Sequence, residues 1–357
     1  IIMTQATRSS LMSVDTTLSE NIDATQNYIP VASTTNFSTS VVAEIETTNE
    51  VVSFDSITTN LQVYSQDFDN AAWTKNNLTV AANSTTAPDG TTTAETLTTN
   101  TTTGGHNVYD SIGNSNGTYS YSVYLKANVS NFGFIGLYDG SNYHGIVVNL
   151  STGTITSTSG TPSSTNVTSV GNGWYRLECV KTITANPSYV LISLSDSGTP
   201  SYTSGRPNFT GVDESIYVWG VQVEEASSVT GYLPTGASSL SGLTTVTRGA
   251  NGTTAASATS GDAIQQLPYA LLNVDMPVRL TGLSVSSDGT GAGRLTLCDK
   301  VGTHLCDVDI PDTKIFDLTF DGGIIFPNGI YVANSDNITA YTLYTSGYNS
   351  PNLTAGG

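Results

Sequence analysis

The sequence is poor in charge, in cysteine and in long apolar runs. Only 11% of its 357 residues are charged, and it contains 3 cysteines and 3 histidines. No stretch approaches the roughly 20 consecutive apolar residues of a membrane-spanning helix. The first residues also lack the continuous apolar segment of a secretory signal. We therefore expect neither membrane insertion nor a signal peptide.

Basic residues are scarcer still. The chain carries 11 Lys and Arg residues against 29 Asp and Glu residues, which gives a formal net charge of −18. A surface this acidic repels the phosphate backbone of DNA and RNA. Nucleic acid is therefore not an expected partner.

The usual catalytic motifs are missing as well. The sequence has no HExxH, GxxxxGK[ST] or helix-opening GxGxxG pattern, and its GxSxG match, GNSNG at 113–117, lies in a Gly- and Asn-rich turn sequence. Its histidines, at positions 106, 144 and 304, each lie next to glycine or a turn, which gives no support to a Ser-His-Asp arrangement. The sequence predicts a non-enzymatic protein.

What the chain does contain is apolar and polar residues in alternation, interrupted every eight to twelve residues or so by Gly, Asn or Pro. This spacing is typical of antiparallel sandwiches and barrels. The stretch TYSYSVYLKA (118–127) places alternate apolar side chains on one face, and in IYVWGVQVE the residue Trp219 falls on the same face as Val221 and Val223. We predict an all-β protein.

Two distant stretches look like the halves of one unit. Residues 28–59 contain VVAEIETTNEVVSFDSI, and residues 241–264 contain LTTVTRGANGTTAA. Together they resemble a small β module of phage structural proteins, split by the block between them. Insertion is tolerated where the two ends of a loop lie close together. The family usually has a His where this chain has Ala258 and Thr259, so the resemblance supports the fold more than any function.

The block between these halves carries four separated segments in order. They are NLQVYSQDFDNAAWTK, YSVYLKA, GNGWYRLECV and YVWGVQVEEASSVTGYLPT. This pattern resembles the jelly-roll, concanavalin-like or carbohydrate-binding-module-like domains of phage tail and virion proteins. Near the C-terminus, GGIIFPNGIYVANSDNITAYTLY resembles the closing strands of small β-sandwich domains in phage virion proteins.

These resemblances imply a fold class and a division of the chain. The class is all-β, with an antiparallel jelly-roll or β-sandwich domain inserted into a small β module and followed by a C-terminal β-sandwich domain. The expected parts are an N-terminal arm (1–21), the discontinuous module (22–60 and 238–264), the inserted lectin-like jelly roll (61–237) and the C-terminal sandwich (265–357).

The same resemblances imply a function. They point to a bacteriophage virion structural protein, assembled in the host cytoplasm and displayed on the virion surface, with other virion proteins as partners. A fibre-type appendage would contact host-surface polysaccharide through its jelly roll, and as a homo-oligomer, most simply a trimer, it would gain avidity from many weak contacts. Two alternatives stay open: a capsid decoration or cement protein that binds no sugar, and a binding module of a secreted bacterial adhesin.

Glycan recognition requires an exposed aromatic face with polar side chains around it. For Trp73 the alternative is a plug over one end of the sandwich, for Trp174 it is packing under a loop, and for the loop LYDGSNYHG it is a solvated hairpin. The candidate contacts are Trp73, Trp174, Tyr138, Asn142, Tyr143 and His144.

Calcium is the one cofactor that the resemblance makes possible, because jelly rolls of this kind often hold an ion where the first and last strands meet. Asp67 and Asp69, with Asp213 and Glu214 opposite, would supply oxygen ligands. The alternative is that these acidic turns are simply solvated.

Two cysteines flank a turn in LTLCDKVGTHLCDVDI. Cys298 and Cys306 would face each other in a hairpin centred near Gly302. A cross-strand disulfide fits that arrangement, whereas assembly in a reducing cytosol favours free thiols.

Overall fold

In the computed structural model all regular elements of the described chain are β-strands, so the predicted all-β class is confirmed. Within the described part there is no helix that could traverse a bilayer. Residues 1–14 of the expected N-terminal arm lie outside the described residues. The described residues are 15–34, 41–45, 47–48, 50–113, 116–184, 189–250, 254–266, 269–272, 278–287, 292–298, 304–311, 315–327, 329–336, 338–346 and 353–356.

The chain divides into two compact units, each built from separate stretches of sequence. Unit 1 comprises Ile1–Asn27, Thr35–Asp55 and Val246–Gly357, and unit 2 comprises Tyr28–Thr34 and Ser56–Thr245. The stretch 61–237 therefore lies in unit 2 together with short stretches on either side of it. The polypeptide chain thus passes from unit 1 into unit 2 and later returns to unit 1, as it does around an inserted domain.

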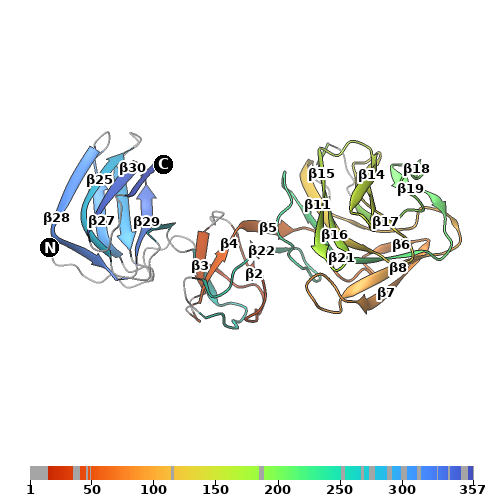
Figure 1. Ribbon diagram of the computed structural model, residues 1–357, viewed down its shortest axis with the longest axis horizontal. Helices are drawn as coiled ribbons and strands as arrows, with labels where there is room; N and C mark the ends of the chain where they lie inside the picture. Colours follow the sequence, from red (N-terminus) through yellow and green to blue (C-terminus); the bar gives the residue numbers. More distant parts are fainter. Residues whose placement is uncertain are drawn as a thin grey trace. The chain divides into compact units, whose positions relative to one another are not determined.

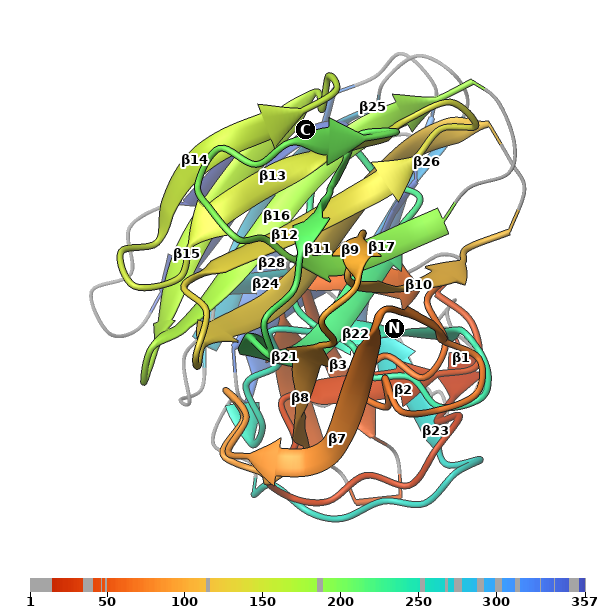
Figure 2. The same ribbon diagram turned by 90° about the vertical axis from the view of Figure 1, so that its right-hand side faces the viewer.

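Unit 2 is dominated by a sandwich of two six-stranded antiparallel sheets (Figures 1 and 2). Sheet I has the order β14 (Thr154–Ser159), β13 (Tyr143–Asn149), β12 (Phe132–Tyr138), β17 (Tyr189–Leu194), β10 (Asn107–Ser111) and β6 (Thr74–Asn76). Sheet II has the order β15 (Ser164–Gly171), β16 (Trp174–Ile183), β11 (Gly117–Ala127), β21 (Ser215–Glu224), β8 (Ala94–Thr99) and β7 (Leu78–Thr85).

Alternate side chains of these strands fill the space between the two sheets. On β11, Tyr119, Tyr121, Val123 and Leu125 all belong to this core, as the alternation predicts. Successive side chains of a strand point to opposite faces, so the intervening residues lie on the outer face. The core is therefore set by the period-two pattern.

Strand β21 departs from that pattern. Val218 and Val221 both face the core, whereas Trp219 packs on the outer face of sheet II beside Tyr124. The cause is a β-bulge, since Gly220 has a φ of 60° and the β11–β21 register shifts nearby. The prediction that Trp219 shares a face with Val221 and Val223 was wrong because one extra residue reverses the alternation.

Unit 2 also contains a three-stranded sheet. Its order is β2 (Tyr28–Val31), β22 (Leu240–Thr244) and β5 (Ser56–Asn60), and Leu243 pairs with both Ile29 and Ile57. The buried amide of Asn60 donates to the carbonyl oxygens of Val221 (3.2 Å) and Leu233 (2.9 Å). These bonds join the small sheet to the end of β21, which explains why it belongs to the unit of the sandwich.

Unit 1 contains a second sheet built from distant parts of the chain. Its order is β1 (Asp15–Thr17), β23 (Ala263–Gln266), β3 (Val41–Ile45) and β4 (Glu50–Phe54). Ile264 pairs with Ile45 on one side and Thr16 on the other. Residues of 28–59 and 241–264 are therefore paired in this sheet and in the three-stranded sheet.

A buried ion pair stabilises this part of unit 1. Glu50 is fully buried, and its carboxylate accepts hydrogen bonds from Arg248 Nε (2.7 Å) and from the backbone N–H groups of Gly249 and Ala256. The Arg248 guanidinium also donates to the backbone oxygens of Asp23 and Ala256. Burial by itself would raise the pKa of Glu50, but these hydrogen bonds and the charge of Arg248 hold the pKa below its usual value. The arginine of the RGANGTTAA stretch thus ties three chain segments together.

The C-terminal part is a β-sandwich of two four-stranded sheets. One sheet has the order β24 (Tyr269–Leu272), β29 (Ile330–Asp336), β26 (Gly293–Cys298) and β27 (His304–Ile310). The other has the order β28 (Ile315–Phe326), β25 (Val278–Ser287), β30 (Ile338–Ser346) and β31 (Leu353–Gly356). Leucines from both sheets, including Leu283 and Leu297, meet in its core.

The cysteine pair lies in this C-terminal sandwich as two buried thiols. Cys306 pairs with Leu297 and Cys298 pairs with His304, because the β26–β27 register shifts between positions 297 and 298. The two cysteines therefore do not stand opposite each other as the hairpin prediction required. Burial raises the pKa of the Cys306 thiol to about 11, which leaves it protonated at neutral pH.

Candidate functional site

The outer face of sheet I carries a row of tyrosines. Tyr138 on β12 pairs with Tyr189 on β17 and with Tyr143 on β13, and Tyr109 on β10 lies diagonally beyond Tyr189. The ring centroids are 4.9 Å apart for Tyr138 and Tyr143, 6.2 Å for Tyr138 and Tyr189, and 5.9 Å for Tyr109 and Tyr189. We call these four residues the tyrosine strip.

Three rings of the tyrosine strip are half-buried, and only Tyr143 is fully buried. Beneath them lie Phe134 and Leu191, which have no exposed surface. Burial raises the pKa of Tyr143 to about 12, although the neighbouring Arg206 opposes that shift. The Tyr143 hydroxyl therefore stays protonated at neutral pH, beside the guanidinium of Arg206.

A short hairpin covers one side of the strip. It consists of β18 (Tyr202–Thr203) and β19 (Arg206–Pro207). The Tyr202 hydroxyl bonds to Ser157 Oγ (2.7 Å), and the Tyr143 N–H donates to the Ser204 carbonyl (2.9 Å). The cover is thus fixed by hydrogen bonds, and it leaves Tyr109, Tyr138 and Tyr189 half-exposed.

The predicted loop LYDGSNYHG lies at the end of the strip. Its Asp139 carboxylate accepts hydrogen bonds from Ser141 N–H and Oγ, from Asn142 N–H (3.0 Å) and from His144 Nε2 (2.6 Å). Burial alone would raise the pKa of Asp139, but these hydrogen bonds hold it well below its usual range. Asn142 is exposed beside Tyr138, so two of the four predicted loop contacts, Tyr138 and Asn142, present surface to solvent.

The His144 ring is buried and bonded within the protein, so it is not available to a ligand. Its Nδ1 accepts the Thr161 N–H (2.8 Å), which requires the proton to sit on Nε2, where the ring donates to Asp139. The side chain is buried, and both ring nitrogens are used within the protein. The hydrogen bonds of His144 therefore connect the β12–β13 turn to the chain that follows β14.

Both predicted tryptophans are buried. Trp73 packs on Phe68 with its Nε1–H donated to the Tyr64 carbonyl (3.0 Å), so it closes an end of the sandwich. Trp174 lies on the outer face of sheet II, where its Nε1–H is donated to the Thr86 carbonyl (3.1 Å). Neither indole offers a ring face to a ligand, and both occupy the packing positions that were their alternatives.

The four residues predicted to hold calcium do not converge. The Glu214 carboxylate bonds to Thr99 Oγ1 and the Val212 N–H, next to the exposed Asp213. Asp67 and Asp69 lie instead in the turn beside Glu95. Glu95 and Thr99, the residues that Asp69 and Glu214 contact, are four residues apart on β8, about 13 Å along the strand, so the two acidic pairs lie at different places along it.

The place beside Asp69 already holds a cation of the protein itself. Lys75 Nζ donates to the backbone oxygens of Asp69 (2.9 Å) and Asn70. Lys75 pairs with the core residue Val108 on sheet I, and Glu95 on sheet II alternates with the core residue Leu97, so both face inward. Within the described residues no group of acids, His or Cys is arranged to hold a metal. The residues present do not fit a calcium ion.

Glu95 is buried next to like charges. Burial, followed by the negative charges of Asp69 and Asp67, raises its pKa to about 8. Burial also lowers the pKa of Lys75, against the opposing effect of Asp69 and Glu95. At neutral pH the Glu95 carboxyl group is therefore largely protonated, and a protonated carboxyl group is a poor ligand for a cation.

Sequence reasoning missed Tyr109, Tyr189 and Arg206, which are half-buried and complete this surface. Tyr189 does alternate with Leu191 on the face opposite Val190, and this was the available signal. Neither a family model nor a curated protein matches this chain. The fold and the site together define an all-β protein in which one outer face of a β-sandwich carries partly exposed aromatic rings.

Proposed function

We propose that unit 2 is a glycan-binding domain and that the tyrosine strip is its contact surface. The observation that carries this proposal is the row of half-exposed rings of Tyr109, Tyr189 and Tyr138 on one sheet face. Tyrosine combines an apolar body that stacks on the C–H groups of a sugar with a hydroxyl that pairs with sugar hydroxyls. The exposed Asn142 and the nearby Arg206 add further hydrogen-bonding groups.

The tyrosine strip lies on an open sheet face rather than in a deep cleft, and this determines the expected affinity for a glycan. A site that buries only part of a ligand gains little apolar contact, so a single domain is expected to bind weakly. Several copies on one particle would convert weak contacts into avidity without any new interaction. A multivalent display is therefore part of the proposal.

The proposed setting is the surface of a phage virion, with the protein acting as a non-enzymatic, homo-oligomeric appendage that touches host polysaccharide. This setting is supported by the resemblance of the 28–59 and 241–264 stretches and of the 61–237 block to virion proteins. The insertion of a sandwich into a small β module is compatible with a domain held out from an anchoring part. The trimeric state is proposed on the same grounds.

A glycan array with the full chain, followed by calorimetry on the best saccharide, tests the proposal. Tyr189→Ala and Tyr138→Ala should each weaken binding by about tenfold, because each removes one stacking ring. Tyr344→Ala is the matched control, since Tyr344 is 43% exposed on the C-terminal sandwich. Equal losses in all three variants, or no binding to any glycan or host cell, would refute the proposal and favour the decoration protein.

A further inference from the structure

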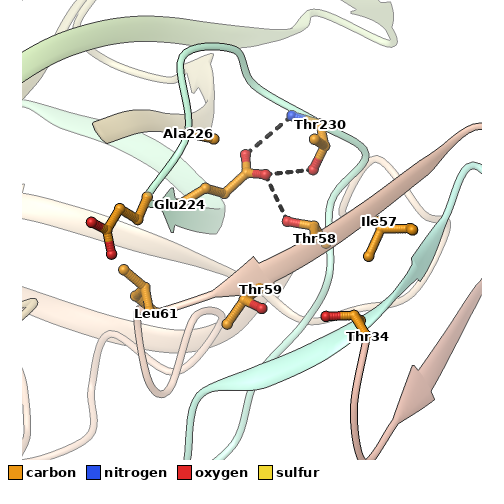
Figure 3. Close-up of a pocket in the computed structure, with 9 residues that line it drawn as sticks. Thr34, Ile57, Thr58, Thr59, Leu61, Glu224, Ala226 and Thr230 are labelled. Carbon is orange, nitrogen blue, oxygen red and sulfur yellow. Dashed lines mark hydrogen bonds between the residues drawn. The ribbon is translucent and has the colours of Figure 1, made fainter. Parts of the chain in front are cut away.

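A cavity of about 350 Å³ lies beside the three-stranded sheet of unit 2. Figure 3 shows that its walls come from β5, from the end of β21 with the chain that follows it, and from Thr34 after β2. Its size falls at the lower end of the range of small-ligand sites, about 300–1,000 Å³. The lining residues are Thr34, Ile57, Thr58, Thr59, Leu61, Glu224, Glu225, Ala226 and Thr230.

Glu224 determines which way the hydroxyl groups of this cavity point. Its Oε1 accepts the hydroxyl protons of Thr58 (2.6 Å) and Thr230 (2.6 Å), as the dashed lines of Figure 3 show. Its Oε2 accepts the Thr230 N–H (3.1 Å) and the side chains of Gln222 (3.0 Å) and Ser120 (3.3 Å). Five donors satisfy this buried carboxylate, so it has no need of an external ligand.

The same bonds fix two of the four lining threonines as acceptors, whereas the Thr59 hydroxyl is bonded to Ser241 Oγ (2.7 Å) and the Thr34 hydroxyl is not bonded to Glu224. A hydroxyl that gives its proton to Glu224 keeps its lone pairs, so Thr58 and Thr230 can only accept from a ligand. Glu225 adds an exposed carboxylate next in sequence, and its Oε1 lies near the Cα of Gly117. No basic side chain is among the lining residues, whereas the half-buried Ile57 and Leu61 provide an aliphatic surface.

We propose that this cavity binds an alkylammonium group, with Glu225 as its counter-ion and the threonine oxygens as hydrogen-bond acceptors. An ammonium is all donors, which matches the acceptors of Thr58, Thr230 and Glu225, and its methylene chain matches the Ile57–Leu61 side. An anion would meet two carboxylates, and a neutral sugar would leave the Glu225 charge without a counter-ion. The net charge of −18 also favours the approach of a cation. This site is separate from the proposed glycan face.

The group has two sources, a lysine side chain of a partner protein and a free polyamine, and the probes distinguish them. Ligand-observed NMR on the full chain would use Nα-acetyl-lysine-N-methylamide, its Nε-acetylated neutral analogue, and 1,4-diaminobutane. We expect the lysine analogue to bind in the millimolar range and its acetylated form at least tenfold more weakly. Additional binding of the diamine would identify any alkylammonium as a ligand, and its absence would point to a protein lysine.

Glu225→Gln removes the proposed counter-ion at an exposed position, so folding is not at stake. This variant should weaken binding of the lysine analogue by about tenfold. Asp196→Asn removes the same charge from another exposed site of unit 2 and should leave the affinity unchanged. Equal affinity for the acetylated analogue, equal losses in both variants, or no binding at about 20 mM would each overturn the proposal.

Discussion

The two outer faces of the sandwich both carry aromatic side chains, but these side chains are buried to different extents. On sheet II, Trp174 and Trp219 are buried, and their indole N–H groups are donated to Thr86 and Thr93 of the β7–β8 connection. On sheet I, the β18–β19 hairpin covers only part of the tyrosine strip, and three rings stay half-exposed. The outer face of sheet II is an accessory core, whereas the outer face of sheet I keeps partly exposed aromatic rings.

The difference shows that aromatic content alone does not indicate a binding face. What separates the two faces is how far each ring is covered, because internal hydrogen-bond partners occur on both faces: the Tyr138 hydroxyl, for example, donates to the Gly140 carbonyl (3.0 Å). An unpaired buried donor costs about 1–3 kcal/mol, so the buried indoles need the internal bonds that they make. The partly exposed rings of Tyr109, Tyr138 and Tyr189 also reach solvent.

The largest expected effect contrasts the two faces directly. Trp219→Ala should lower the free energy of unfolding of unit 2 by about 3–5 kcal/mol, because it empties a packed site between Tyr124 and Tyr232. Tyr189→Ala should cost no more than about 1–2 kcal/mol, since its ring is already half-exposed. Thermal unfolding of both variants checks this. Similar losses would mean that the two faces are equally structural.

A second test concerns Glu95 of sheet II, which faces inward near Lys75 of sheet I. Its folded-state pKa of about 8 lies above the unfolded value of 4.5, so the native state keeps a proton that the unfolded chain releases. Stability should therefore fall by a few kcal/mol as the pH rises from about 4.5 to 8, and then level off. Glu95→Gln should flatten that part of the stability–pH curve. An unchanged slope in this variant would contradict the assigned protonation.

A smaller, local effect is expected at the end of the tyrosine strip. Asp139→Ala removes the acceptor of four hydrogen-bond donors in the β12–β13 turn and should cost about 1–2 kcal/mol. The pKa of Asp139 is depressed, so its contribution is present above the unfolded value of 3.8 and is lost as the pH falls through the lower folded-state pKa. Amide exchange of residues 139–144 measures this. Faster exchange on sheet II as well would argue against a local effect.

The last prediction is that calcium has no effect on stability. Because Lys75 Nζ occupies the carbonyl oxygens of the Asp69 turn, calcium should leave the melting temperature of the protein unchanged. Scanning calorimetry with calcium and with a chelator checks this. A rise in melting temperature with calcium would show that the ion displaces the lysine, and would restore the sequence-based prediction of Asp67 and Asp69 as ligands.

The sequence predicted those features that depend on local alternation. The inward residues of β11, such as Tyr121 and Val123, follow strict period two. Trp219 was misplaced because the bulge at Gly220 leaves no mark on an otherwise regular pattern. Local pattern thus fixes faces only as long as no bulge intervenes.

The candidate site could be predicted only in part because it is assembled across strands. Tyr138 and Asn142 came from one loop, but Tyr109 and Tyr189 join them through the β10–β17–β12 pairing, which no local signal encodes. The same holds for Arg248, which reaches Glu50 over 198 positions of the chain. Contacts of this range depend on the order of strands in a sheet rather than on the residues around each position.

The most direct test of the glycan-binding account is fluorine NMR of the full chain labelled with 3-fluorotyrosine, with signals assigned by Tyr→Phe variants. Addition of a binding saccharide should shift the signals of Tyr109, Tyr138 and Tyr189 and leave those of Tyr124 and Tyr232 on sheet II unchanged. Shifts confined to tyrosines outside the strip, or spread equally over both faces, would contradict it.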